Sequence, residues 1–234
     1  MTPRTPKPAV MTAQPLTPDA FTLIAITDDI RDGIEGLVAR AVCAVRGGAT
    51  MVQLRLKDVD ARTLATAARA LIVALPSDVP LIVNDRADVA LACEAAGVHV
   101  GADDVPPAAL RRIVPAGFVI GASVGSDDEI ANAASADYVG IGPVNASPSK
   151  LDAGIAIGVA GFARLARLAQ CPAIAIGGLT RESAAAVIAA GAAGVATISS
   201  IFGSRDPEAA ARSLRLAIDE ARQSAAGGSA HPPA

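Results

Sequence analysis

The sequence is poor in aromatic side chains. It has no tryptophan, one tyrosine and four phenylalanines among 234 residues, although 52% of the residues are hydrophobic. A core without large rings must be built from Ala, Val, Ile and Leu. Because such small side chains let helices approach parallel strands closely, this composition favours an α/β protein.

Long apolar runs and a strong excess of one charge are also absent. No run reaches the roughly 18 residues that a membrane-spanning helix needs, so we expect no membrane segment. The formal net charge is −3, and no basic stripe or arm is present. This argues against a nucleic-acid partner and leaves small molecules as the expected substrates. The sequence leaves open whether the protein is a homo-oligomer.

Cysteines are few and unpaired in pattern. Cys43, Cys93 and Cys171 are odd in number, lie within apolar segments and form no CxxC motif. We expect free thiols in a reducing compartment, and therefore a cytoplasmic location.

The two ends differ in composition from the rest of the chain. Residues 1–20 lack an apolar signal core and are rich in Pro and Thr, and residues 223–234 are rich in Ala, Gly, Ser and Pro. We expect a disordered leader and a disordered tail, with one folded domain over 21–222.

Between these ends, short β-branched runs alternate with alanine-rich stretches of helical character. We expect strands over 22–27, 50–55, 80–85, 97–101, 118–123, 137–142, 172–177 and 194–199. Helices are expected over 32–48, 60–76, 87–97, 106–114, 126–136, 159–170, 180–191 and 206–223. Eight β/α units in about 200 residues predict a single (β/α)₈ TIM barrel. The alternative is an open doubly wound sheet, but no GxGxxG motif follows the first strand.

Unusual polar residues follow the expected strands. In a barrel of this kind the chemistry gathers where the strands end. The residues are Gln53, Arg55 and Lys57 after the second strand, Asn84 and Asp85 after the third, Asp103 and Asp104 after the fourth, Ser123 at the fifth, Ser147, Ser149 and Lys150 after the sixth, Gly177 and Gly178 after the seventh, and Ser199 and Ser200 at the eighth. Gln53, Arg55 and Lys57 alternate along the chain, which predicts that their side chains share one side.

This set of side chains suits phosphate chemistry. The cations Arg55, Lys57 and Lys150, with neutral donors beside them, match a diphosphate. Asp85 and Asp104 would repel such an anion unless a divalent cation such as Mg²⁺ stood between them. Asp103 and Asp104 have the alternative role of capping a helix that begins at Pro106.

A second phosphate site is expected where Gly177 and Gly178 open a helix beside Ser199, because the loops after the seventh and eighth strands commonly bind a monophosphate in this architecture. Two phosphate sites would then face each other across one barrel mouth. His99 lies inside an expected strand, and we expect a packed residue there rather than a catalyst.

The segments "TMVQLRLKD", "LIVNDRADVALACEAAGVHVGADD", "ADYVGIGPVNASPSK", "AIAIGGLT" and "GVATISSIF" together resemble the signatures of the thiamine-phosphate synthase (thiamine-phosphate pyrophosphorylase) family, in order from about residue 21 to 207. The resemblance implies a (β/α)₈ transferase of thiamine biosynthesis that uses Mg²⁺. Such an enzyme joins hydroxymethylpyrimidine diphosphate to thiazole phosphate and releases pyrophosphate. The C–O bond to diphosphate breaks first, and the thiazole nitrogen captures the pyrimidinyl-methyl cation.

The resemblance also implies roles for individual residues. Gln53, Arg55, Lys57, Asn84, Ser123 and Lys150 would bind the pyrimidine diphosphate, and Arg55, Lys57, Ser123 and Lys150 would be catalytic. Ser147, Ser149, Gly178, Ile198 and Ser199 would bind the thiazole phosphate. Asp85 and Asp104 would hold Mg²⁺.

The chain departs from the family pattern at Ile24, Ala102, Gly125 and the pair Asn145–Ala146. Three rival functions remain open. A thiazole tautomerase of the same barrel would use a histidine where Gly125 stands. A sugar-phosphate isomerase would leave Lys57, Asp85 and Asp104 without a role. A non-catalytic binding protein would bind the thiamine precursors without releasing pyrophosphate.

Overall fold

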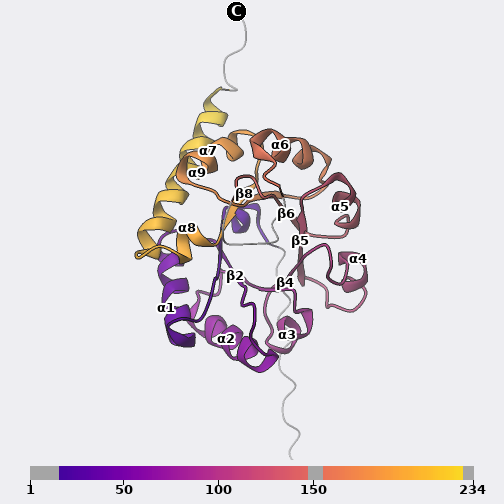
Figure 1. Ribbon diagram of the computed structural model, residues 1–234, viewed down its shortest axis with the longest axis vertical. Coiled ribbons are helices and arrows are strands. Elements are labelled where there is room, and N and C mark those ends of the chain that lie inside the picture. The colour runs from indigo at the N-terminus through magenta and orange to yellow at the C-terminus, as the bar shows by residue number, and fades with distance from the viewer. Residues whose placement is uncertain (1–15, 147–154, 229–234) are drawn as a thin grey trace, which may run out of the picture.

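The computed structural model describes residues 16–146 and 155–228. Eight parallel strands form a closed barrel in the order β1 to β8, and helices surround it (Figure 1). The predicted TIM barrel is confirmed, and the open doubly wound sheet is excluded. The strands are β1 (Leu23–Ile26), β2 (Met51–Leu54), β3 (Leu81–Asn84), β4 (Gly97–Val100), β5 (Val119–Val124), β6 (Tyr138–Ile141), β7 (Ala173–Ile176) and β8 (Gly194–Thr197).

Helices follow the strands, and several are shorter than the sequence pattern predicted. The longer helices are α1 (Gly33–Arg46), α2 (Ala61–Ala74), α6 (Gly158–Leu168), α7 (Arg181–Ala189) and α9 (Pro207–Gly228). The shorter ones are the 3₁₀ turn η1 (Pro18–Phe21), α3 (Ala87–Ala92), α4 (Pro107–Leu110), α5 (Asp127–Asn132) and α8 (Ser199–Phe202).

Apolar side chains fill two layers. One cluster, which includes Ile24, Met51 and Tyr138, fills the inside of the barrel. The larger cluster lies between the strands and the helices, where residues such as Leu37 and Phe162 are fully buried. Because each strand is covered on both faces, it reads in the sequence as a continuous apolar run.

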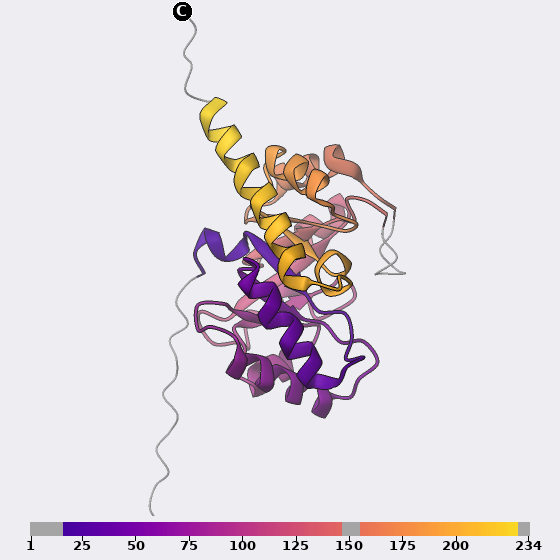
Figure 2. The same ribbon diagram turned by 90° about the vertical axis from the view of Figure 1, so that its left-hand side faces the viewer.

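Helical structure extends a few residues past both expected bounds of the folded domain. Helix α9 continues to Gly228, past the boundary expected at 222, and lies beside α1 and α7 (Figure 2). Alanines 225 and 226 favour helix, so the composition that suggested a tail also extends α9. At the other end, η1 begins at Pro18, inside the expected leader, and buries Phe21.

Two local predictions at the barrel mouth were wrong. Ser199 and Ser200 do not end β8 but begin the short helix α8. Gly177 and Gly178 do not open a helix directly, because both have positive φ (101° and 57°) and α7 starts only after Thr180, which caps it by accepting from Ser183 N. Among the described helices, none combines the length and apolar character that a membrane-spanning segment requires.

Candidate functional site

Two amide side chains lie inside the barrel at the carboxyl ends of β2 and β3. Gln53 is only 4% exposed, and its Nε2 donates a hydrogen bond to Asn84 Oδ1 at 2.8 Å. Strands β2 and β3 are paired neighbours, and this pairing brings Gln53 close to Asn84, 31 positions further along the chain. This bond leaves the Gln53 Oε1 acceptor and the Asn84 Nδ2 amide group available for other hydrogen bonds.

Arg55 is held by its backbone just beyond β2. Thr27 Oγ1 donates to Arg55 O at 2.9 Å and accepts from Arg55 N at 2.8 Å. Within the described part of the chain, no carboxylate forms an ion pair with the Arg55 guanidinium. The sequence offered no signal for Thr27, because this clamp joins two strands.

We expected strand alternation to place the side chains of Gln53, Arg55 and Lys57 on one side. However, β2 ends at Leu54, before the last two of these residues. Gln53 is buried, Arg55 is half-buried and Lys57 is exposed. The three residues therefore follow the chain outward from the barrel interior, and regular alternation does not set their directions.

The carboxylates at the ends of β3 and β4 come from neighbouring strands. Asp85 adopts φ 61°, a left-handed conformation unusual outside glycine, and its N–H donates to His99 O at 2.8 Å. Asp104 Oδ2 accepts from Gly101 N at 2.7 Å. The capping alternative for Asp104 is not realised, because α4 has Pro106 as its N-cap and no side-chain cap bond.

Ser123 ends a chain of three hydrogen-bonded side chains. Its Oγ lies 3.0 Å from His99 Nε2, and His99 Nδ1 lies 3.0 Å from the Tyr138 hydroxyl. His99 is 7% exposed, as expected of a packed residue, yet it contacts a predicted site residue. Burial, followed by the charge of Asp137, raises the pKa of Tyr138, so the phenol keeps its proton.

A hollow of about 240 Å³ lies beside Asp104 and Ser123. Its walls come from the carboxyl ends of β4 and β5 and from α4 and α5, and they include Gly101, Ala102 and Glu129. Glu129 Oε2 accepts from Gly125 N at 2.6 Å. Two of the departures from the family pattern, Ala102 and Gly125, therefore lie at or next to this hollow.

The loops after β6, β7 and β8 are joined by hydrogen bonds. Asn145 N donates to Gly177 O and Asn145 Nδ2 to Gly178 O, each at 3.0 Å, and Ser200 Oγ donates to Leu179 O at 2.6 Å. A Cβ on Gly178 would lie 2.6 Å from Ala146 O. The approach of these loops therefore requires glycine, and Asn145, which sequence reasoning treated as a departure, holds them together.

Three of the predicted residues, Ser147, Ser149 and Lys150, lie outside the described residues. The chain on either side of them is attached to the mouth: Val144 N donates to Ile176 O at 2.8 Å, and Gly158 N donates to Val144 O at 2.9 Å. Ser199 is exposed at the start of α8, and Ile198 is half-buried at its N-cap.

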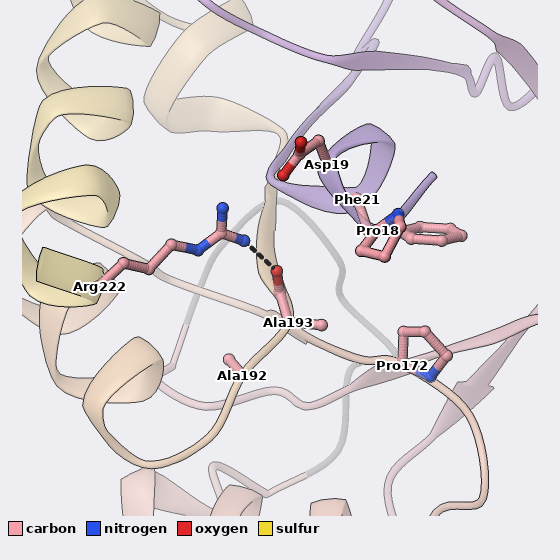
Figure 3. A pocket seen from close by; sticks show the side chains of 7 residues that line it. All are labelled: Pro18, Asp19, Phe21, Pro172, Ala192, Ala193 and Arg222. Atoms are coloured by element: carbon pink, nitrogen blue, oxygen red, sulfur yellow. Dashed lines mark hydrogen bonds between the residues drawn. The ribbon is translucent and has the colours of Figure 1, made fainter. Parts of the chain in front are cut away.

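A second hollow, of about 290 Å³, lies at the opposite end of the barrel, where the chain enters β1, β7 and β8. Figure 3 shows the side chains that line it. It is lined by residues that precede strands, among them Asp19, Phe21 and Pro172, and by Arg222, which donates to Ala193 O at 2.6 Å. None of the predicted site residues lines it. The predicted site and this hollow are therefore separate.

The described residues contain neither a cluster of three metal-binding side chains nor a disulfide. In residues 16–146 and 155–228 no group of three or more His, Cys, Asp or Glu side chains is placed to hold a metal ion. Cys43, Cys93 and Cys171 are free. Burial, with a smaller effect of Asp137, raises the pKa of Cys171, so this thiol is a poor nucleophile.

Comparisons with known proteins identify related sequences and a solved structure of the same fold. The family described as thiamine monophosphate synthase matches residues 23–201. The chain is 46% identical over 209 residues to thiamine-phosphate synthase of Azorhizobium caulinodans, covering 88% of this chain and 99% of that protein. It is 44% identical over 213 residues to thiamine-phosphate synthase of Roseiflexus castenholzii, covering 89% and 93%. The solved structure of thiamine phosphate pyrophosphorylase from Pyrococcus furiosus superposes with a TM-score of 0.78 at 33% identity, covering 87% and 98%.

Proposed function

Because the chain belongs to the thiamine-phosphate synthase family of transferases, we propose that it condenses two substrates at the carboxyl ends of its strands. These are 4-amino-5-hydroxymethyl-2-methylpyrimidine diphosphate and 4-methyl-5-(2-hydroxyethyl)thiazole phosphate. The products are thiamine phosphate and pyrophosphate. The observation that carries this proposal is the convergence of Gln53, Asn84, Asp104 and Ser123 on consecutive strand ends, β2 to β5.

The pyrimidine diphosphate fits the β2–β3 side of the mouth. The Gln53–Asn84 pair offers an acceptor and a donor to the exocyclic amine and ring nitrogen of a pyrimidine. Arg55 and Lys57 continue outward from this pair, where the diphosphate would extend. Lys150 and Ser123 complete the set of donors in the proposal.

The reaction requires charge stabilisation more than proton transfer. The C–O bond between the pyrimidine methylene and the diphosphate breaks, and its electron pair leaves on the diphosphate oxygen. The lone pair of the thiazole nitrogen then forms the new C–N bond to the methylene cation. Arg55, Lys57 and Lys150 oppose the negative charge that develops on the leaving group, and fixed donors of this kind commonly supply the largest share of catalysis.

The carboxylates fit a magnesium ion shared with the substrate. Mg²⁺ prefers hard oxygen ligands and is commonly bound by one or two protein carboxylates together with substrate phosphates. Asp85 and Asp104 supply such a pair from adjacent strands, and Asp104 Oδ2 is already oriented by Gly101 N. When bound, the ion would neutralise charge on the diphosphate.

The thiazole phosphate fits the joined loops after β7 and β8. This is the usual phosphate position of the architecture, and here it contains Gly178, Ile198 and Ser199. Ser147 and Ser149 would contribute hydroxyls from the preceding loop. The free thiols support the cytoplasmic location that also belongs to this proposal.

The test is product analysis after mixing the purified protein with both substrates and Mg²⁺. We expect pyrophosphate and thiamine phosphate in equal amounts from the wild type, and a loss of at least about a hundredfold in rate for Lys150→Ala. Binding of both substrates without pyrophosphate release would favour the non-catalytic reading. Isomerisation of the thiazole precursor without condensation would favour the tautomerase.

A further inference from the structure

We propose that Tyr138 and His99 are positioning residues that fix the direction of the Ser123 hydroxyl. The Tyr138 hydroxyl donates to His99 Nδ1, His99 Nε2–H donates to Ser123 Oγ, and the Ser123 proton is left to donate to the leaving diphosphate. The last step, donation to the diphosphate, rests on the proposed function. The directions of the two hydrogen bonds in the substrate-free protein are independent of it.

The direction follows from the burial of Tyr138. Its side chain is 1% exposed inside the barrel, next to the Phe21 ring at a centroid distance of 5.2 Å. Among the described residues, the one hydrogen-bond partner of its hydroxyl is His99 Nδ1. If Nδ1 carried a proton and donated, the phenolic proton would remain buried without an acceptor, which is strongly unfavourable.

The same reasoning fixes the state of the imidazole. An imidazolium would also present Nδ1–H to Tyr138 and leave the phenolic proton without an acceptor. The acceptor role of Nδ1 places the imidazole proton of this arrangement on Nε2. That proton points to Ser123 Oγ, 3.0 Å away.

Two glycines leave the space inside the barrel that the His99 and Tyr138 rings occupy. Gly121 on β5 lies in register with both His99 on β4 and Tyr138 on β6. A Cβ on Gly121 would lie 2.5 Å from His99 Nδ1 and would also overlap the Tyr138 ring, and a Cβ on Gly140 would lie 3.3 Å from His99 Cε1. The lack of side chains at Gly121 on β5 and Gly140 on β6 therefore lets the two rings pack closely, as residues that position Ser123 must.

Ser123, the outer member of this hydrogen-bonded series, faces the barrel mouth. Ser123 is half-buried and lines the hollow beside Asp104, and its Oγ has no second partner among the described residues. One lone pair of Oγ accepts from His99, so the hydroxyl proton is directed away from the barrel interior. A donor held in place before the reaction stabilises a leaving anion better than one that must reorient. Because consecutive hydrogen bonds polarise one another, the bonds through Tyr138 and His99 also polarise the Ser123 hydroxyl.

The first test is nitrogen NMR of ¹⁵N-histidine-labelled, substrate-free protein. We expect His99 to show a protonated Nε2 and an unprotonated Nδ1, and we expect this tautomer preference to weaken in Tyr138→Phe. A protonated Nδ1 in the wild type would overturn the proposal. Since no substrate is present, this result is independent of whether the proposed reaction occurs.

The second test is a double-mutant cycle on pyrophosphate release. Tyr138→Phe should lower kcat by about three- to tenfold, the worth of one hydrogen bond, with little change in either KM. In a Ser123→Ala background the same substitution should have no further effect. Ile174→Val, which trims the same interior cluster, controls for packing and should leave kcat unchanged. A full Tyr138→Phe loss that persists without Ser123 would contradict the proposal.

Discussion

At the scale of single residues, the mouth depends on side chains whose positions are set by partners far away in the sequence. The positions of Gln53, Asn84 and Ser123 near strand ends could be predicted, because these polar residues stand out at the ends of apolar runs. Their partners could not. Thr27 and Arg55, 28 positions apart, meet just beyond the paired strands β1 and β2. His99 and Tyr138, 39 positions apart, meet across Gly121 of the strand between theirs.

The backbone conformation of Asp85 could not be predicted from the sequence either. Its left-handed φ of 61° has no signature in the sequence, since Asp tolerates this conformation without requiring it. Non-glycine residues with such dihedrals concentrate at functional sites. Asp58 and Glu94 adopt the same conformation (φ 61° and 58°), so the proposed metal-binding role of Asp85 rests on its place at the end of β3 and not on its backbone.

The proposed ligand role of Asp104 can be separated from general acidity at the mouth. Asp104→Asn should raise the Mg²⁺ concentration for half-maximal pyrophosphate release by at least about tenfold, because a neutral amide is a weaker ligand. Asp103→Asn is the matched control, since Asp103 is the exposed neighbour and has no proposed ligand role. Equal shifts in the two variants would contradict the assignment.

At the scale of elements, strand and helix order could be predicted from alternating composition, and the errors lie at element ends. The run "GVATISS" is β-branched up to Ser199, yet the strand stops at Thr197 and α8 begins at Ser199. Short apolar runs do not separate strand from helix by periodicity. Likewise, the alanines that extend α9 to Gly228 resemble a low-complexity tail when read without their neighbours.

Helix α2 provides a pH-dependent test of an element end. Asp60 caps this helix by accepting from Thr63 N at 2.7 Å, and this bond lowers the pKa of Asp60. A lowered folded-state pKa means that the charged cap stabilises above the ordinary Asp range and loses this effect as pH falls through the folded value. Wild type should therefore be more stable than Asp60→Asn at neutral pH.

The two proteins should converge as the pH drops below the ordinary Asp range. Denaturant midpoints measured over a pH series would show this convergence. A stability gap that stays constant or widens toward acid would mean that the charge of Asp60 does not contribute to the cap.

At the scale of the whole molecule, closure of a parallel barrel places every strand's carboxyl end at one mouth. This is why the sequence could place residues from Gln53 to Ser199 at one end of the barrel, where we propose that they form a single site. The pairing of β1 with β8 closes the barrel, and α9 reinforces this seam through Arg222, a contact that the sequence did not indicate. Arg222 donates to Thr22 Oγ1 at 3.0 Å and to Ala193 O at 2.6 Å, joining the chain entering β1 to the chain entering β8.

Replacing Arg222 should weaken this closure. Arg222→Met removes both hydrogen bonds while keeping an apolar side chain of similar length. It should lower the free energy of unfolding by about 2 kcal/mol, the scale for hydrogen bonds from a charged group. Urea unfolding measures the change, and a loss below about 0.5 kcal/mol would show that other α9 contacts suffice.

The most direct test of where the chemistry lies compares two arginines at opposite ends of the barrel. Pyrophosphate release would be measured for Arg55→Met at the mouth and Arg222→Met at the opposite hollow, each corrected for the folded fraction. We predict that Arg55→Met loses at least about a hundredfold in kcat/KM, whereas Arg222→Met retains wild-type turnover. Loss of turnover in Arg222→Met with retention in Arg55→Met would contradict the assignment of the active site to the carboxyl ends of the strands.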